Sequence, residues 1–490
     1  MFFWFEVFRT KKTLLVLFGQ LFKKTVTDRG KMKNYTFYLV VLLSCTLLFR
    51  AQAQSSGAKA LSIKECLEYA SENNYNLRIA RLDETISDKR IIEVRSTGLP
   101  QANINGVFED RLKIPLLIIP NMDQFMGGGQ GGIPMGYQYN SSLSGEVSQM
   151  IYDQTFWTGL KAAKSSTRYY AQNSAWVNEN TAYTIADAYY KVIVIEKQLA
   201  LLNINLSNTT TTLSMTELQF NNGLAKKVDI NRLRVSKSNL ESQIKQSELN
   251  LEQAYNNLKF QMGMPLNQAI TLRDTTFELS EAELKSGETP DQFFDKRLDY
   301  KLLETSLELQ KLDQKSITNQ YFPRLTGFAN YSYVGQGPDL GLYKTKNNDW
   351  VDYTTASIGL RLSIPVFDGL RKSALVQQSK VKQDQLKQQL DLKKQQIDIE
   401  VSNAEIQYKN TYHRIASEQE NVDLAEEVYN VTQLEFKEGV GTSTDVVNAE
   451  FALRQAQNIY IGTLLELYTA RLQLEKAKGN IINYLTSNSQ

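Results

Sequence analysis

The sequence predicts an α+β chain that contains two internal structural repeats, each with a helix, two strands and a pair of long helices. Two observations predict this class. Landmark residues recur in the same order at nearly constant spacing. In addition, short tracts that alternate between apolar and polar residues precede long proline-free tracts rich in Gln, Lys, Leu, Ala and Glu. Alternation at period two is typical of strands, and this composition favours long helices.

The N-terminal part carries the features of an export signal. Met32 opens a basic segment, an apolar stretch follows from Tyr35, and the small residues around Ala53 fit a signal-peptidase site. We therefore predict a signal peptide from Met32 to Ala53 and a misassigned start codon for residues 1–31. An alternative is open, because the residues before Cys45 resemble a lipobox and Cys45 is then a possible lipidation site.

Composition argues against several classes of protein. The 490 residues include 55 Lys and Arg against 53 Asp and Glu, whereas a nucleic-acid-binding protein should be strongly basic. After cleavage at Ala53, Cys66 is the single cysteine, so no disulfide within the chain is possible. The single histidine, His413, lies in a polar tract and has no cysteine nearby to complete a zinc site. We expect no enzymatic activity, no metal and no cofactor.

After the signal, the sequence has no run of about 18 or more apolar residues, so a membrane-spanning helix is not predicted. If the protein sits in a membrane, a closed β-barrel is the other structure that satisfies every backbone polar group.

Four landmarks define the duplication. Phe220, Gly223 and Asp229 recur 216 residues later as Phe436, Gly439 and Asp445, and Gly263 recurs at the same offset. The segment 148–153 matches 363–368 at an offset of 215, and the Leu-Pro at 99–100 matches the Phe-Pro at 322–323 at 223. We place repeat 1 at 54–285 and repeat 2 at 286–490.

Each repeat begins with a helix that a proline ends, from Leu61 to Thr97 and from about Pro290 to Tyr321. Alternating tracts then predict strands at about 101–114, 137–151, 324–335 and 353–365. The glycine-rich segment at 127–132 lacks the ending of a phosphate loop, so we interpret it as a surface loop.

Long helices close each repeat, at about 155–262 and about 369–478. In the second repeat an apolar seam suits packing against another helix, while the remaining surface of that helix is predicted to be polar. This seam comprises Leu386, Leu390, Ile397, Val401, Ala404 and Tyr408. Such helices cannot bury a globular core, so they must pair with each other or line water.

Each long tract is interrupted by a hairpin tip. Gly223 and Gly439 can adopt positive φ and end the first helix of each pair. Thr442, Ser443 or Thr444 can cap the returning helix, and Asp445 falls in its first turn, where the helix dipole favours a negative charge.

Together, these motifs resemble the TolC family of outer-membrane factors. The resemblance covers nearly all of the mature chain, from the segment LSIKECLEYASENNYNL at 61–77 to the end, and it includes both Phe-x-x-Gly…Asp tips. It implies a homotrimer with a shared 12-stranded β-barrel, four strands per chain, continued by a long α-helical coiled-coil barrel. The expected location is the outer membrane of a Gram-negative bacterium, in contact with its lipid and extending into the periplasm. A barrel shared between copies also agrees with physics, because four strands cannot close a barrel and lipid tolerates no open sheet edge.

The resemblance also implies roles for the tips. Asp445 matches a periplasmic gate residue, Asn448 stands where the family often has a second aspartate, and Asp229 is the equivalent residue of the first tip. An alternative for Asp445 is a helix-start charge without a gate role. Docking of a periplasmic adaptor is expected at the tips, and Gly441 stands where the family often has an arginine. The expected docking residues are Phe220, Gly223, Leu224, Phe436, Gly439, Val440, Gly441 and Thr442.

Three functions remain open. The first is the outer-membrane exit duct of a tripartite efflux system, which works with a periplasmic adaptor (membrane fusion) protein and an inner-membrane transporter and passively conducts small toxic compounds or drugs. The second is the outer-membrane channel of a type I protein-secretion system. The third is a periplasmic coiled-coil scaffold without a pore, against which the paired alternating tracts argue.

Overall fold

The computed structural model describes residues 59–117, 133–273, 291–340 and 350–487. The predicted signal peptide, Cys45 and the glycine run at 127–132 lie outside the described residues. The contacts divide the chain into two units. The smaller one holds most of β1 (Lys59–Leu61) and β6 (Ile270–Leu272), which pair as a two-stranded sheet. All that follows concerns the larger unit. Within the described residues, no helix combines the length and the apolar composition needed to cross a bilayer.

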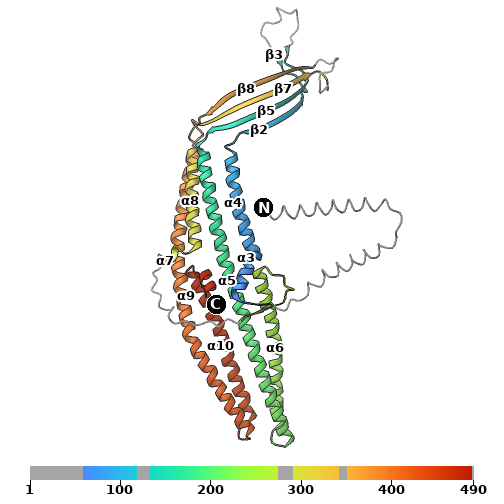
Figure 1. The fold of residues 1–490 in the computed structure, drawn as a ribbon, viewed down its shortest axis with the longest axis vertical. Helices are drawn as coiled ribbons and strands as arrows, with labels where there is room; N and C mark the ends of the chain where they lie inside the picture. The colour runs from blue at the N-terminus through green and yellow to red at the C-terminus, as the bar shows by residue number, and fades with distance from the viewer. Residues whose placement is uncertain (1–58, 118–132, 274–290, 341–349, 488–490) are drawn as a thin grey trace, which may run out of the picture. The chain divides into compact units, whose positions relative to one another are not determined.

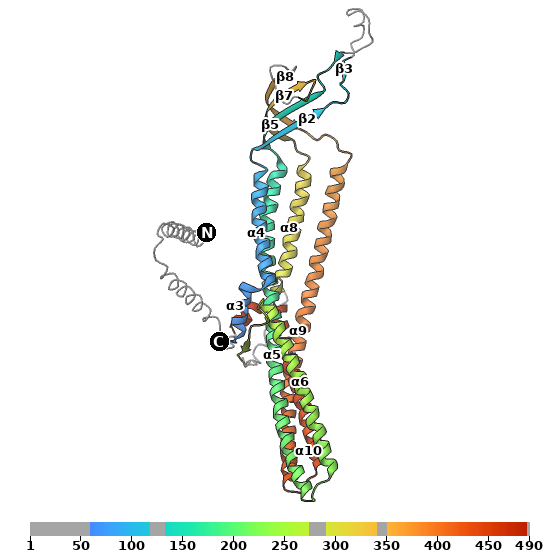
Figure 2. The ribbon, with the colours of Figure 1, turned by 90° about the vertical axis from the view of Figure 1, so that its right-hand side faces the viewer.

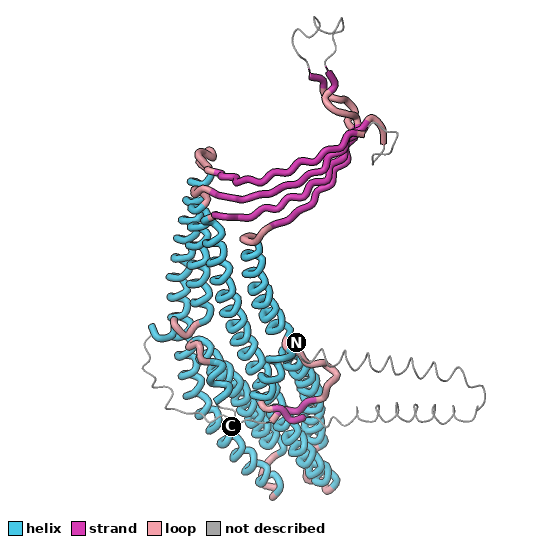
Figure 3. The backbone as a smooth tube through the Cα atoms, turned by 45° about the horizontal axis from the view of Figure 1, so that its top comes forward, coloured by secondary structure: helices cyan, strands magenta, loops and turns pink. Residues whose placement is uncertain are grey.

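Four strands form one antiparallel sheet in the order β2-β5-β7-β8 (Figure 1), which is drawn in magenta in Figure 3. The predicted ends shift by a few residues, and β2 stops at Asp110 rather than near residue 114. Because the order follows the chain, β2 of the first repeat and β8 of the second are the two edge strands. The bounds are β2 Gln101–Asp110, β5 Tyr139–Tyr152, β7 Arg324–Gly337 and β8 Val351–Ser363, with a short ribbon of β3 (Leu116–Leu117) and β4 (Ile133–Pro134).

The helices next to the sheet form a row of four. Contacts run from α4 (Tyr75–Ser96) to α5 (Gln154–Asn221), on to α8 (Leu298–Asn319) and then to α9 (Arg371–Lys437) (Figures 1 and 2). We call this the strand-side row. Its two outer members are α4 from the first repeat and α9 from the second.

A second row lies toward the hairpin tips. Here α6 (Lys227–Met262) packs along α5, α5 packs against α10 (Ser443–Ala477), and α10 packs along α9. We call this the tip-side row. The long helices α5 and α9 belong to both rows, whereas α4 is replaced by α6 and α8 by α10. Short helices α3 (Ile63–Asn73) and α11 (Ile481–Ser487) also pack against α5.

The replaced helices abut through a connection that occurs twice. Asn74 caps α4 and donates its side-chain N–H to the Gln261 carbonyl near the end of α6, at 2.6 Å. In the second repeat, Arg297 precedes α8 and donates to the Ala477 carbonyl at the end of α10, at 3.0 Å. Unpaired carbonyls at a helix end need such donors. We call these connections the two splices.

The splices correct the predicted helices. A single helix from Leu61 to Thr97 was expected, but the chain breaks at Asn74 into α3 and α4. The expected helix from about Pro290 is likewise split into α7 (Asp291–Phe294) and α8. Both breaks have a physical reason, because α4 must start where α6 ends and α8 must start where α10 ends. The splice residues keep the offsets of the duplication, 223 for Asn74 and Arg297 and 216 for Gln261 and Ala477.

A glycine allows the two helix ends of each splice to approach closely. Gly263 follows α6 with φ +73°, and Gly479 follows α10 with φ +70°. A Cβ on Gly263 would lie 2.4 Å from the Asn73 carbonyl oxygen, and a Cβ on Gly479 would lie 3.2 Å from the Lys296 backbone. Glycine is therefore required at the first splice for space as well as for its backbone conformation.

The second splice is also an ionic network. Arg297 contacts Asp299 at 2.6 Å and Glu400 of α9 at 2.8 Å, and Lys393 of α9 contacts Asp299 at 2.7 Å. Burial alone would raise the pKa of Asp299, but hydrogen bonds and charge from Arg297 and Lys393 outweigh it and hold that pKa well below its usual range. The network ties α8 to α9 at the level where α10 ends.

Candidate functional site

The two hairpin tips close with the same backbone geometry. At the first tip, Gly223 has φ +75° and the Leu224 N–H donates to the Gln219 carbonyl at 2.8 Å. At the second, Gly439 has φ +80° and the Val440 N–H donates to the Glu435 carbonyl at 2.9 Å. This bond, from the residue after the glycine back to the last turn, is the Schellman cap of a helix. The glycines thus occupy the conformation expected from the sequence.

The returning helix of the second tip begins with a capping box, whereas the first tip has only the aspartate half of one, because the Lys226 side chain cannot accept a hydrogen bond. Of the three candidate caps, Thr442 takes the role: its hydroxyl accepts from the Asp445 N–H at 3.3 Å. Asp445 accepts in return from the Thr442 hydroxyl at 2.6 Å and from the Thr442 N–H at 3.3 Å. At the first tip, Asp229 accepts from the Lys226 N–H at 3.2 Å and lies 3.6 Å from Arg232. Both aspartates therefore start helices, and Asp445 remains exposed on α10 together with Asn448, one turn further along.

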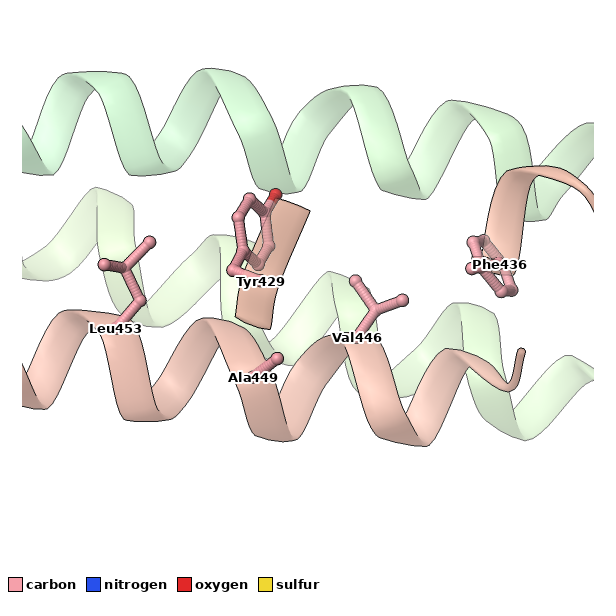
Figure 4. Packing of buried hydrophobic residues seen from close by; sticks show 5 residues of the cluster. All are labelled: Tyr429, Phe436, Val446, Ala449 and Leu453. Carbon is pink, nitrogen blue, oxygen red and sulfur yellow. The ribbon is translucent and has the colours of Figure 1, made fainter. Parts of the chain in front are cut away.

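Each tip exposes one aliphatic side chain, and the phenylalanines of the two tips differ in burial. Leu224 and Val440 are both 80 % exposed. Phe220 is half-exposed, whereas Phe436 is buried in the α9–α10 hairpin with Tyr429, Val446, Ala449 and Leu453 (Figure 4). The expectation that Phe436 contacts a partner directly is therefore wrong for this structure, because its ring fills the core of its own hairpin.

Specific bonds join the two tips, and the sequence did not point to them. Arg232 of α6 donates to the Thr444 hydroxyl at the start of α10, at 2.7 Å. Gln219 of α5 donates to the Phe436 carbonyl at 3.4 Å. Val447 of α10 also packs against the core of the first hairpin, formed by Leu213, Ile230 and Leu233. The hairpins thus contact one another near their ends.

Further from the tips, buried polar side chains join α5 and α10, which are also in contact through the rings of Tyr190 and Tyr468. Thr209 donates to the Glu450 carboxylate, and Asn205 donates to Gln457 at 2.8 Å. Glu450 is 2 % exposed, and its nearest cation is Arg454 at 4.0 Å. Burial raises the pKa of Glu450, although Thr209 and Arg454 act in the opposite direction. In contrast, each hairpin is held internally by apolar side chains.

The outer helices of both rows carry exposed apolar seams. On α9, Leu392, Ile399 and Ile406 recur every seven residues and are 54–64 % exposed. They lie on the side opposite the buried seam that includes Ile397, Val401 and Ala404. The expectation that the remaining surface of α9 is polar is therefore wrong. The outer partners carry matching seams, with Tyr75, Ile79, Leu82 and Ile86 on α4 and Val228, Val235 and Leu249 on α6.

Comparisons with known proteins agree with this geometry. Residues 313–480 match a family model described as outer membrane efflux protein. The chain is 20 % identical to the outer membrane protein TolC of Vibrio cholerae over 87 % of this chain and 92 % of that protein. It is also 20 % identical to the pyoverdine export outer membrane protein OpmQ of Pseudomonas putida, over 86 % and 84 %. Among solved structures, the CmeC outer membrane channel of Campylobacter jejuni superposes with a TM-score of 0.70 at 14 % identity, covering 87 % of this chain and 89 % of CmeC.

The duplicated helical hairpins, the spliced rows and the four-stranded sheet define the class of outer-membrane efflux channels, which are channels rather than enzymes. The chain is similar over most of its length to the outer membrane efflux proteins of the TolC family. It is a protein of the outer membrane that extends into the periplasm.

Proposed function

We propose that three copies of this chain form one outer-membrane exit duct, which passively conducts small toxic compounds from the periplasm to the outside. The observation that carries the proposal is the same open arrangement, and it occurs in three parts of the structure. The sheet, the strand-side row and the tip-side row are each an open row of four elements. Each row has one outer element from the first repeat and one from the second, so the same pairing between copies can close all three.

Closure of the sheet follows from the physics of lipid. The outer strands β2 and β8 have free backbone groups among the described residues, and the hydrocarbon core tolerates none. Pairing β2 of one copy with β8 of the next removes both edges. Three copies then supply 12 strands, four from each chain, which is within the range of bacterial barrels.

The exposed apolar seams of α9, α4 and α6 explain how the helical rows close between copies. Heptad-spaced apolar residues on α9 need an apolar partner, and α9 has no extensive contact with α4 or α6 of its own chain in the described residues. In the proposed ring, α9 of one copy packs against α4 and α6 of the next. The polar remainder of the rows then faces water, including a central bore.

We infer that the α9–α10 tips form the periplasmic gate, with Asp445 and Asn448 of three copies facing each other. The polar contact between α5 and α10 supports this, because a hydrogen-bonded interface can exchange its partners for water when the hairpin moves. A ring of three Asp445 carboxylates attracts cations.

Asp445→Asn is expected to lower the cation-over-anion selectivity of channels in planar bilayers, because three carboxylates leave the constriction. The matched control is Asp229→Asn, which removes the same capping carboxylate from the other tip. Equal effects of the two variants, or none from Asp445→Asn, would show that Asp445 only caps a helix.

We also propose that the tips dock a periplasmic adaptor that connects the duct to an inner-membrane transporter. Exposed Leu224 and Val440 offer apolar contacts on otherwise polar tips, and Phe220, Gly223, Gly439, Gly441 and Thr442 surround them. Buried Phe436 positions its tip from inside the hairpin.

Gly439→Trp is expected to abolish transport while the oligomer still assembles. A Cβ on Gly439 meets nothing within 4 Å, so the bulk projects outward rather than into the fold. Gly369→Trp is the control, because Gly369 also has positive φ (+67°) and open surroundings but lies before α9, at its strand-side end. Normal export by Gly439→Trp, measured as drug resistance of the host cell, contradicts docking at this tip.

Small molecules are favoured over secreted proteins as cargo, because one relative is named for pyoverdine export and others for antibiotic or toluene efflux. Deleting the gene should sensitise the host to several small toxic compounds, and the intact gene should restore resistance. Unchanged susceptibility together with loss of a secreted protein would instead support the type I secretion channel. A scaffold without a pore predicts no conductance in bilayers.

A further inference from the structure

A pocket of about 660 Å³ lies beside the second splice, between α5, α8, α9 and α10. Trp176, Glu179 and Tyr183 of α5 line one side of it, Arg297 lies at the start of α8, and Lys476 comes from the last turn of α10. This volume is within the range that accommodates small organic ligands. The pocket is distant in sequence from both tips, and neither the gate nor the docking surface uses it.

Most charges that line this pocket cancel one another. Arg297, Asp299, Lys393 and Glu400 form the connected ionic network of the splice, with two positive and two negative groups. Glu179 and Lys476 remain outside that network. The pocket therefore presents one carboxylate and one ammonium that are not paired with each other within 4.0 Å.

Glu179 is largely buried and makes no direct contact with a cation among the described residues. Its side chain is 8 % exposed, and it forms no hydrogen bond or ion pair with any residue that the structure describes. Burial raises its pKa, since a charged carboxylate is costly to remove from water, while the positive charges of Arg297 and Lys476 act in the opposite direction. An ionised group in this position lacks the N–H donors that stabilise buried carboxylates elsewhere.

Lys476 supplies the opposite charge. Its ammonium lies 4.4 Å from the centre of the Tyr183 ring, a cation–π contact, and it makes no ion pair within the described residues. Burial lowers its pKa. A ligand that carries only a positive charge would be repelled by Lys476, and one that carries only a negative charge would leave Glu179 unpaired. A ligand with both charges satisfies the two groups together.

We propose that this pocket binds a small amphoteric aromatic molecule, whose ammonium pairs with Glu179, whose anionic group pairs with Lys476, and whose ring packs on Trp176. The aromatic part is assigned from the indole of Trp176, which is 38 % exposed and lines the pocket. This site does not depend on transport, so it stands or falls separately from the proposed duct.

The test uses the purified full-length protein in detergent and three related probes. Phenylalanine carries both charges, its methyl ester carries only the ammonium, and N-acetylphenylalanine carries only the carboxylate. Calorimetric titration should show saturable binding of phenylalanine, one per chain, at least tenfold tighter than either derivative. Trp176 should report the same binding by fluorescence, and Trp176→Phe should remove that signal. Absence of saturable phenylalanine binding, or equal binding of all three probes, overturns the proposal.

Glu179→Gln should weaken phenylalanine binding at least tenfold while leaving the affinity for N-acetylphenylalanine unchanged. Lys476→Met should give the opposite selectivity, with the methyl ester unaffected. Asp187→Asn is the matched control on the same helix, because that carboxylate pairs with Lys191 at 2.6 Å and does not line the pocket. Circular dichroism establishes that each variant is folded. Unchanged phenylalanine binding by folded Glu179→Gln also overturns the proposal.

Discussion

Replacing Gly263 with alanine is expected to destabilise the protein more than any other single methyl group added at a helix end. The new Cβ would lie 2.4 Å from the Asn73 carbonyl oxygen and 2.7 Å from its carbon, and backbone atoms cannot rotate away as a side chain can. The positive φ of Gly263 adds the usual penalty for an L-residue. Together these costs amount to about 3 kcal/mol.

Gly223→Ala is the matched control for this prediction. Gly223 has nearly the same φ, +75°, but a Cβ there meets nothing within 4 Å. Its cost should therefore be the conformational term alone, ~1 kcal/mol. Thermal unfolding followed by circular dichroism compares the two variants. Equal midpoints would mean that the splice between α6 and α4 is not tightly packed in the protein.

Placing two aspartates on the exposed seam of α9, Ile399→Asp with Ile406→Asp, is expected to prevent assembly. These side chains are 60 % and 64 % exposed in the single chain, so the fold of each subunit should survive. In the assembled ring they would be buried against α4 and α6 of the next copy. An unpaired carboxylate in such an interface costs several kcal/mol, and the ring contains three interfaces.

Lys387→Asp provides the control for charge. It lowers the net charge by the same two units as the double variant, on the same helix, at an exposed position that is not a helix-face neighbour of Leu392, Ile399 or Ile406. Size-exclusion chromatography with light scattering in detergent should show assembled Lys387→Asp and dissociated Ile399→Asp with Ile406→Asp. An intact oligomer in both variants would mean that α9 does not form the contact between copies.

The tips could be predicted almost completely from the sequence, because their determinants are local. Gly223, Gly439, Thr442 and Asp445 act through bonds within a few residues, and the structure places them in the expected caps. The strands were also recognisable from their alternation. What the sequence could not show is that Phe436 is buried while Phe220 is half-exposed, since this difference depends on how the second hairpin packs.

The splices were missed for a different reason. Asn74 and Gln261 are 187 residues apart, and both lie in tracts of helical composition. No Pro or Gly marks the break at Asn74, so the sequence favoured one continuous helix. The offsets of the duplication contained a signal, because they change from 223 to about 216 within each repeat, but only the structure shows which ends meet.

The exposed seam of α9 was missed because the first apolar seam was sufficient to explain a helix pair. Leu392, Ile399 and Ile406 fall between polar residues and do not stand out until the order of the rows shows that α9 is an outer member. The position of α9 at the edge of both rows therefore identifies these three residues as the proposed contact with a second copy.

The central claim is that three copies close the open rows. Its most direct test is native mass spectrometry, which measures the mass of the intact, signal-processed protein extracted from the outer membrane in mild detergent. Three chains per particle are expected, and cysteines introduced at Ile399 and Ile79 should crosslink neighbouring copies. A particle that contains a single chain and still conducts ions in a planar bilayer would contradict the account.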